Sequence, residues 1–89
     1  MSLRKHKIQN IKGLHARASA KLVEVVESFD AHARVSKDGE TTGGDSIMGL
    51  LMLAASIGTY IEVETSGNQA EELADAIENL VNDKFGEGE

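Results

Sequence analysis

The chain has 89 residues, which is enough for one domain and too few for two. Hydrophobic residues make up 40% of it but aromatic residues only 3%, so a small core must be built from aliphatic side chains. It has no cysteine, which excludes disulfides, thiolate metal ligands and cysteine nucleophiles. No apolar run approaches the roughly 20 residues that span a bilayer, and no signal-peptide block is present. We therefore expect a single cytoplasmic domain over residues 1–89.

The net charge of −6 is unevenly distributed along the chain. The basic residues up to Lys21 are accompanied by no acid, and every carboxylate side chain falls from Glu24 onward. Such a segment can attract a phosphate or an acidic partner, or it can be an unevenly charged solvated surface. It is too short and too poor in aromatic residues to indicate nucleic-acid binding in an acidic domain.

The first elements follow from changes in the hydrophobic period. Residues Arg4 to Gln9 predict a short strand, and Gly13 breaks its pattern. From Ala16 to Phe29, apolar residues recur at helical spacing and charged residues take the opposite face. Residues 31–36 then alternate between apolar and polar side chains, which predicts a strand with one buried face.

A hairpin and a short helix are predicted in the middle of the chain. Asp38-Gly39 is a turn signal, so residues 40–42 should begin the returning strand, which Gly43-Gly44 ends. Ser46 is well placed to cap a helix that runs from Ile47 to Leu53.

The last third of the chain predicts a strand and a helix. Residues Tyr60 to Thr65 alternate again, with the carboxylates facing outward. Asn68, with Glu71 three residues later, resembles a capping box. The stripe of the final helix, which Gly86 should stop, consists of Leu73, Ile77, Leu80 and Val81. We expect residues 86–89 to form a frayed acidic tail.

The order of elements is therefore β-α-β-β-α-β-α. This order predicts an α+β fold, an open-faced two-layer sandwich in which three helices cover one face of a four-stranded, mainly antiparallel sheet.

One stretch contains residues suited to phosphate chemistry. His15 falls at the start of the first predicted helix, where backbone N–H groups of residues such as Ala16 and Arg17 have no partner within the helix. A neutral imidazole is a nucleophile near neutral pH, and the Arg17 guanidinium can bind phosphate oxygens. A histidine that merely caps or packs at a helix start is the alternative interpretation. His6 and His32 lie in strand patterns without comparable surroundings.

Two motifs together resemble a known family. Gly13-Leu14-His15-Ala16-Arg17 is similar to the phosphohistidine signature of the HPr family, the phosphocarriers of the phosphoenolpyruvate-dependent phosphotransferase system. The segment from Asp45 to Leu53 resembles the family's second signature, which surrounds a regulatory serine. The resemblance covers essentially the whole chain and implies the HPr-like form of the predicted fold.

The resemblance implies specific roles. His15 would accept a phosphoryl group on Nδ1 from phosphorylated enzyme I and pass it to a histidine of an enzyme IIA-type protein, while Arg17 and the amides of Ala16 and Arg17 stabilise the group. No cofactor or metal is implied, and the chain would be a carrier rather than a stand-alone enzyme, working as a monomer without inserting into a membrane. An apolar docking patch beside the histidine would consist of Leu14, Ile47, Met48 and Leu51, although each of these residues could equally belong to the core.

Two further positions bear on regulation. The resemblance implies that an ATP-dependent HPr kinase would phosphorylate Ser46, which can also act as a helix cap. Ala18 stands where family members usually have proline, a difference that affects local rigidity and suggests a regulatory branch of the system.

Two other functions compete with this interpretation. An acyl carrier protein would use Ser46 of Asp45-Ser46-Ile47 for its prosthetic group, but such carriers are helix bundles. A non-catalytic HPr-like module would act through Ser46 alone, and the presence of His15 argues against it.

Overall fold

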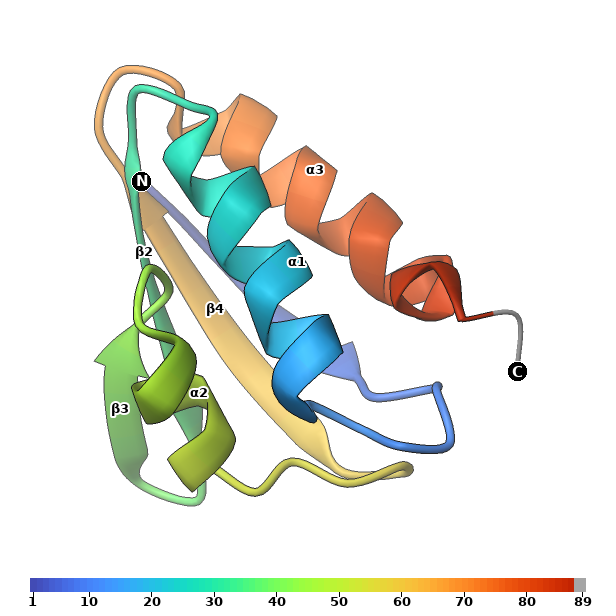
Figure 1. Cartoon of the computed structure of the whole chain (residues 1–89). Coiled ribbons are helices and arrows are strands. Elements are labelled where there is room, and N and C mark those ends of the chain that lie inside the picture. The colour runs from blue at the N-terminus through green and yellow to red at the C-terminus, as the bar shows by residue number, and fades with distance from the viewer. Residues whose placement is uncertain (88–89) are drawn as a thin grey trace.

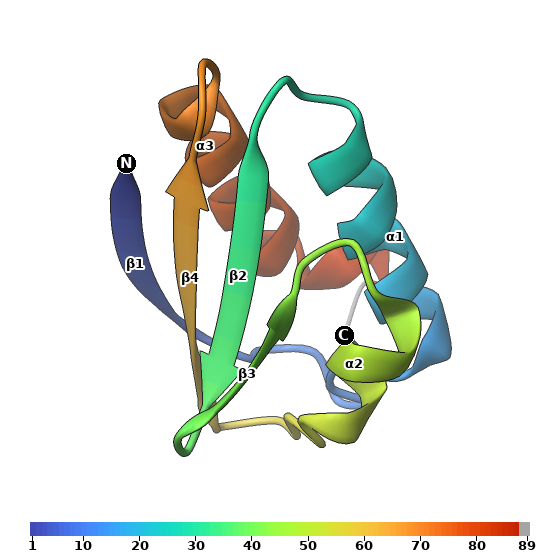
Figure 2. The same ribbon diagram turned by 90° about the vertical axis from the view of Figure 1, so that its left-hand side faces the viewer.

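A four-stranded antiparallel sheet forms one layer of the protein in the computed structural model, which describes residues 1–87. The strands lie in the order β1-β4-β2-β3, and every pairing is antiparallel. Figure 2 shows the strands side by side, with α3 behind them and α1 and α2 to their right. Their bounds are Ser2–Lys7 for β1, His32–Lys37 for β2, Glu40–Gly43 for β3 and Tyr60–Ser66 for β4.

The helices cover one face of this sheet, so the predicted α+β sandwich is confirmed (Figure 1). Two long helices run side by side, and a shorter one lies near β3. Their bounds are Ala16–Glu27 for α1, Ile47–Met52 for α2 and Ala70–Asn82 for α3, followed by a short 3-10 helix, η1, over Lys84–Gly86. Within residues 1–87, no helix is both long enough and apolar enough to cross a bilayer.

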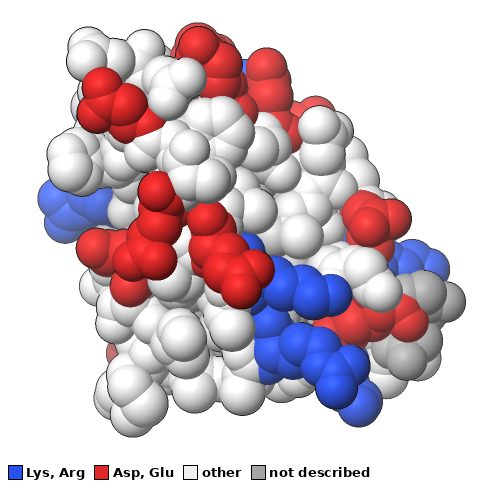
Figure 3. All heavy atoms as spheres, turned by 45° about the horizontal axis from the view of Figure 1, so that its top comes forward, with Lys and Arg blue, Asp and Glu red and all other residues white. Residues whose placement is uncertain are grey.

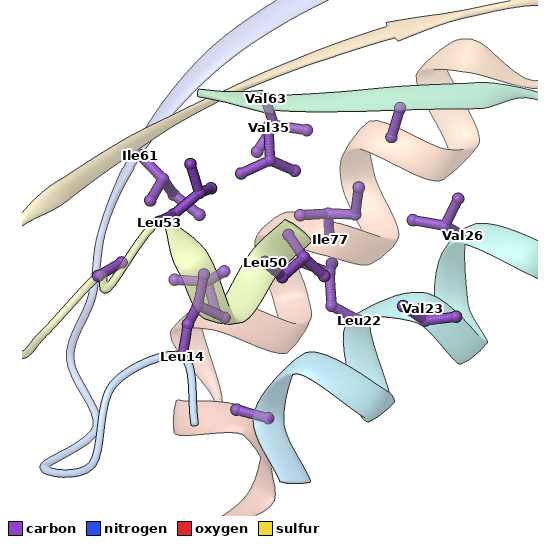
Figure 4. Packing of buried hydrophobic residues seen from close by; sticks show 14 of the residues in the cluster. Leu14, Leu22, Val23, Val26, Val35, Leu50, Leu53, Ile61, Val63 and Ile77 are labelled. Atoms are coloured by element: carbon purple, nitrogen blue, oxygen red, sulfur yellow. The ribbon is translucent and has the colours of Figure 1, made fainter. Parts of the chain in front are cut away.

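The core lies between the sheet and the helices. Alternate residues of the central strands, such as Val35 and Val63, point toward Leu22 of α1 and Ile77 of α3 (Figure 4). Val35 and Val63 are also direct partners in the pairing of β2 with β4. Aliphatic side chains dominate this core. Phe85 is the only fully buried aromatic residue in the described part of the chain.

The predicted turn and cap have the expected geometry. Asp38 and Gly39 both take positive φ, 52° and 86°, which is the conformation that a tight two-residue hairpin requires. The Ser46 side chain accepts a hydrogen bond from the Gly49 N–H at 3.0 Å, so it caps α2.

The capping box predicted at Asn68 is wrong. Helix α3 begins one residue later than a cap at Asn68 requires, because Gln69 is its N-cap and makes no capping hydrogen bond. Asn68 instead donates to the Asp30 carboxylate at 2.9 Å, and Gln69 accepts from the Asp30 N–H at 2.8 Å. These side chains join two loops rather than cap a helix.

Two residues of the tail expected to fray, Gly86 and Glu87, belong to the described part of the chain. Gly86 ends η1, and the Glu87 side chain contacts His15, the residue directly before α1. Residues 88 and 89 lie outside the described residues.

His6 is a buried polar residue on the helix-facing side of β1. It pairs with Ile61 across the sheet and is only 7% exposed. Burial lowers its pKa from the ordinary value of 6.5, and the positive charge of Arg4 acts in the same direction, while Glu78 opposes both.

Burial of His6 predicts a pH-dependent stability. Below pH 6.5 the unfolded chain binds a proton on His6 that the folded chain does not yet bind, so the free energy of unfolding should fall as the pH is lowered through this window. The non-titrating variants His6→Phe and His6→Gln should lose this component. Urea denaturation at pH 7.5 and pH 5.5 measures it, and an equal pH dependence in wild type and both variants would contradict the prediction.

Candidate functional site

His15 lies directly before α1 and is its N-cap residue. Its backbone is extended, with φ −77° and ψ −176°, and its carbonyl accepts the Ser19 N–H at 2.8 Å. The His15 side chain makes no capping hydrogen bond, which removes the interpretation of this residue as a capping histidine. The imidazole is 27% exposed, so a partner can reach it from solvent.

The loop before His15 is fixed by backbone contacts with the segment after α2. The Leu14 N–H donates to the Ala55 carbonyl at 2.9 Å, and its side chain packs into the core. Gly13 has φ +65°, and a Cβ at this position would lie 2.3 Å from the Ala55 oxygen. Only glycine fits this close approach in a left-handed conformation.

Asn10 holds the same loop through a buried hydrogen bond. It is fully buried, and its Nδ2 donates to the Gly13 carbonyl at 2.8 Å. The same nitrogen lies 3.0 Å from Oε1 of Glu87. Asn10 therefore connects the loop that ends in His15 with the chain that follows η1.

Glu87 approaches His15 directly. Its Oε2 contacts Nε2 of the imidazole, and its side chain is only 6% exposed. The hydrogen bond from His15 is the main cause that lowers the pKa of Glu87, with Asn10 and the charge of Lys12 acting in the same direction and burial opposing them. The carboxylate is therefore ionised at neutral pH.

Asn10 and Glu87 are two site residues that the sequence did not predict. Asn10, three residues before a glycine, has a turn-type spacing that could have pointed to it. Glu87 lies in a Gly- and Glu-rich stretch whose composition resembles a disordered tail, so only the tertiary structure could reveal its contact.

The first turn of α1 offers hydrogen-bond donors beside His15. The N–H groups of Ala16, Arg17 and Ala18 have no acceptor among residues 1–87, as expected for a first helical turn. The Arg17 side chain is exposed, and within this part of the chain no ion pair engages it. An anion at this position would meet backbone donors and a free cation.

The basic start of the chain does not form one continuous positive surface. Arg4 pairs across the fold with three carboxylates of α3, at 2.9 to 3.3 Å, namely Glu71, Asp75 and Glu78. Lys21 donates to the Phe85 carbonyl at 2.6 Å. On the face that Figure 3 presents, several basic side chains gather together and acidic groups lie beside them. The exposed cations nearest to His15 in the chain are Lys12 and Arg17.

The predicted docking residues differ in exposure. Met48 is 69% exposed and Ile47 40% exposed, both on α2. Leu51 is half-buried and lines, together with His15, a shallow pocket that also includes Lys12, Leu14 and the loop from Ala54 to Ser56. Leu14 is buried in the core, which favours the packing alternative for this residue over a place on a docking surface.

Comparison with known proteins gives consistent results. A family model described as the PTS HPr component phosphorylation site matches residues 3–83. The phosphocarrier protein HPr of Cupriavidus necator is 45% identical over 82 residues, covering 92% of each chain, and the phosphocarrier protein NPr of Escherichia coli is 41% identical over 81 residues, covering 90% of each. A crystal structure of HPr-C-His from Thermoanaerobacter tengcongensis superposes with a TM-score of 0.93 at 34% identity, over 98% of each chain.

The close approach at Gly13 predicts a large cost for a side chain. Gly13→Ala should lower the free energy of unfolding by more than the roughly 1–2 kcal/mol that a left-handed conformation costs, because the methyl group also meets the Ala55 backbone. Gly39→Ala is the matched control, since Gly39 also has positive φ but no atom near the added Cβ. Urea denaturation of both variants tests this, and equal losses would argue against the contact.

Proposed function

Because the chain belongs to the HPr family of phosphocarrier proteins of the phosphotransferase system, we propose that His15 accepts a phosphoryl group from phosphorylated enzyme I. It then passes the group to a histidine of an enzyme IIA-type protein. The observation that supports this most directly is the position of a solvent-reachable imidazole at the start of α1, beside backbone donors without partners. We place this reaction in the cytoplasm.

The chemistry requires little beyond these groups. The attacking ring nitrogen is Nδ1, as the resemblance implies. The transferred group carries negative charge. This charge is stabilised by the N–H groups of Ala16 and Arg17, by the Arg17 guanidinium and by the positive end of the helix dipole. Each of these groups acts on the transferring phosphoryl. The donor and the acceptor of that group are other proteins, so the chain would work as a carrier that turns over only with its partner enzymes.

Partner proteins would dock next to this imidazole. Ile47 and Met48 expose apolar side chains on α2, and Leu51 shares the shallow pocket with His15. An apolar surface beside a reactive group is suited to the transient contact that phosphoryl transfer needs. We propose that these three residues form the docking patch.

The two competing functions are less well supported. An acyl carrier protein is a helix bundle, and the four-stranded sheet excludes that fold. A module that acts only through Ser46 would have no use for an accessible histidine with free helix amides beside it. Ala18, where family members usually have proline, is the reason to propose an acceptor in a regulatory branch of the same system.

Phosphorylation by enzyme I tests the main proposal. Wild type incubated with phosphoenolpyruvate and purified enzyme I should gain one phosphoryl group that brief acid treatment removes, since phosphoramidate bonds are acid-labile. His15→Ala should gain none. Intact mass measures both. An unmodified wild type, with enzyme I shown to be active, would refute the assignment of His15.

Ser46 should accept a second, different modification. With ATP and an HPr kinase, wild type should gain an acid-stable phosphoryl group that Ser46→Ala does not gain. The added negative charge on the N-cap of α2, close to the docking patch, should slow subsequent phosphorylation of His15 by enzyme I. Comparing initial rates for the two forms measures this effect. An equal rate in both forms would contradict the prediction that a phosphate on Ser46 interferes with docking of enzyme I.

A further inference from the structure

The carboxylate of Glu87 is held in a specific place. Both of its oxygens have partners, Oε2 on the imidazole of His15 and Oε1 on the Asn10 amide. Asn10 is itself fully buried and also holds the Gly13 carbonyl, so one side chain fixes the carboxylate relative to the loop that carries His15. The contact is therefore part of a connected polar network rather than an isolated surface pair.

The chain takes an unusual path to bring Glu87 to this position. Lys84 and Phe85 have consecutive left-handed backbones, with φ of 55° and 54°, which costs free energy for residues other than glycine. Phe85 is fully buried, and its carbonyl accepts the Lys21 ammonium at 2.6 Å. Strained residues that are fixed on both sides are common where a functional group must be placed precisely.

We propose that Glu87 is a positioning residue, which holds the His15 imidazole so that Nε2 carries the hydrogen and Nδ1 the lone pair. This inference rests on the proposed function and adds a residue to it. An ionised carboxylate can only accept hydrogen bonds, so the ring nitrogen that it contacts must be the donor. In a neutral imidazole the other nitrogen then has a free lone pair.

This arrangement fits the phosphoryl-transfer step. The Nδ1 lone pair attacks the phosphorus of a phosphohistidine donor, the new N–P bond forms, and the donor's P–N bond breaks with its electron pair returning to the donor ring. The proton on Nε2 stays in place, so the His15 ring gains positive charge as the bond forms. The shielded Glu87 carboxylate offsets this charge, as a carboxylate does for the histidine of a catalytic triad.

The rate of phosphoryl acceptance tests the consequence for transfer. Glu87→Ala should reduce the initial rate with enzyme I about tenfold or more, by analogy with the loss seen when a carboxylate that orients a metal-bound histidine is removed. Glu87→Gln, which keeps an acceptor oxygen without the charge, should fall between Glu87→Ala and wild type. Glu72→Gln removes an exposed carboxylate of α3 and should keep the wild-type rate. A wild-type rate in Glu87→Ala would overturn the inference.

The position of the new bond tests the tautomer independently of any enzyme. Phosphoramidate, a chemical phosphoryl donor, should modify wild-type His15 on Nδ1, while Glu87→Ala should gain a larger share of product on Nε2, which NMR of the phosphorylated ring distinguishes. An unchanged ratio of the two products would overturn the inference, and urea denaturation establishes that the variant is folded. If enzyme I does not modify wild type but this ratio still shifts, the proposed function fails and the role of Glu87 stands.

Discussion

The contact between the Gly13-Leu14 backbone and Ala55 is the constraint on which the site depends. It connects the loop before α1 to the segment after α2, and burial of the Leu14 side chain anchors that loop in the core. His15 follows immediately, so its position is determined by packing of its neighbour rather than by contacts of its own with the sheet. The same contact brings the start of α1 next to α2, where Leu51 and His15 line one pocket.

Local patterns were sufficient to predict the order of elements, the Asp38-Gly39 turn, the Ser46 cap and the location of His15 at a helix start. These features depend on neighbours within a few residues, which the sequence displays directly. The capping box at Asn68 was wrong because Asp30, 38 residues away in the chain, binds the amide that was expected to cap α3. Local spacing cannot reveal a competitor from another loop.

Only part of the site could be predicted from the sequence. His15, Arg17 and the free amides follow from the helix start and from the motif. Leu14 could not be assigned, because an apolar residue in a loop has the same appearance whether it is buried or exposed. Glu87 lies 72 residues from His15, and its role depends on two left-handed residues and on a buried Phe85 that turn the chain back. The basic start of the chain left open a positive field or an unevenly charged surface, and the pairing of Arg4 with three carboxylates of α3 depends on a helix far along the chain.

Ala18 has a consequence for folding that is separate from the chemistry. Its N–H has no acceptor within residues 1–87, and its methyl group is fully buried. A proline ring in this place would therefore break no hydrogen bond, and it would restrict the freedom of the unfolded chain more than alanine does. Alanine leaves that freedom larger by an entropy equivalent to about 0.4–1 kcal/mol. Alanine at this position thus shifts the balance between folded and unfolded molecules without removing a hydrogen bond from the site.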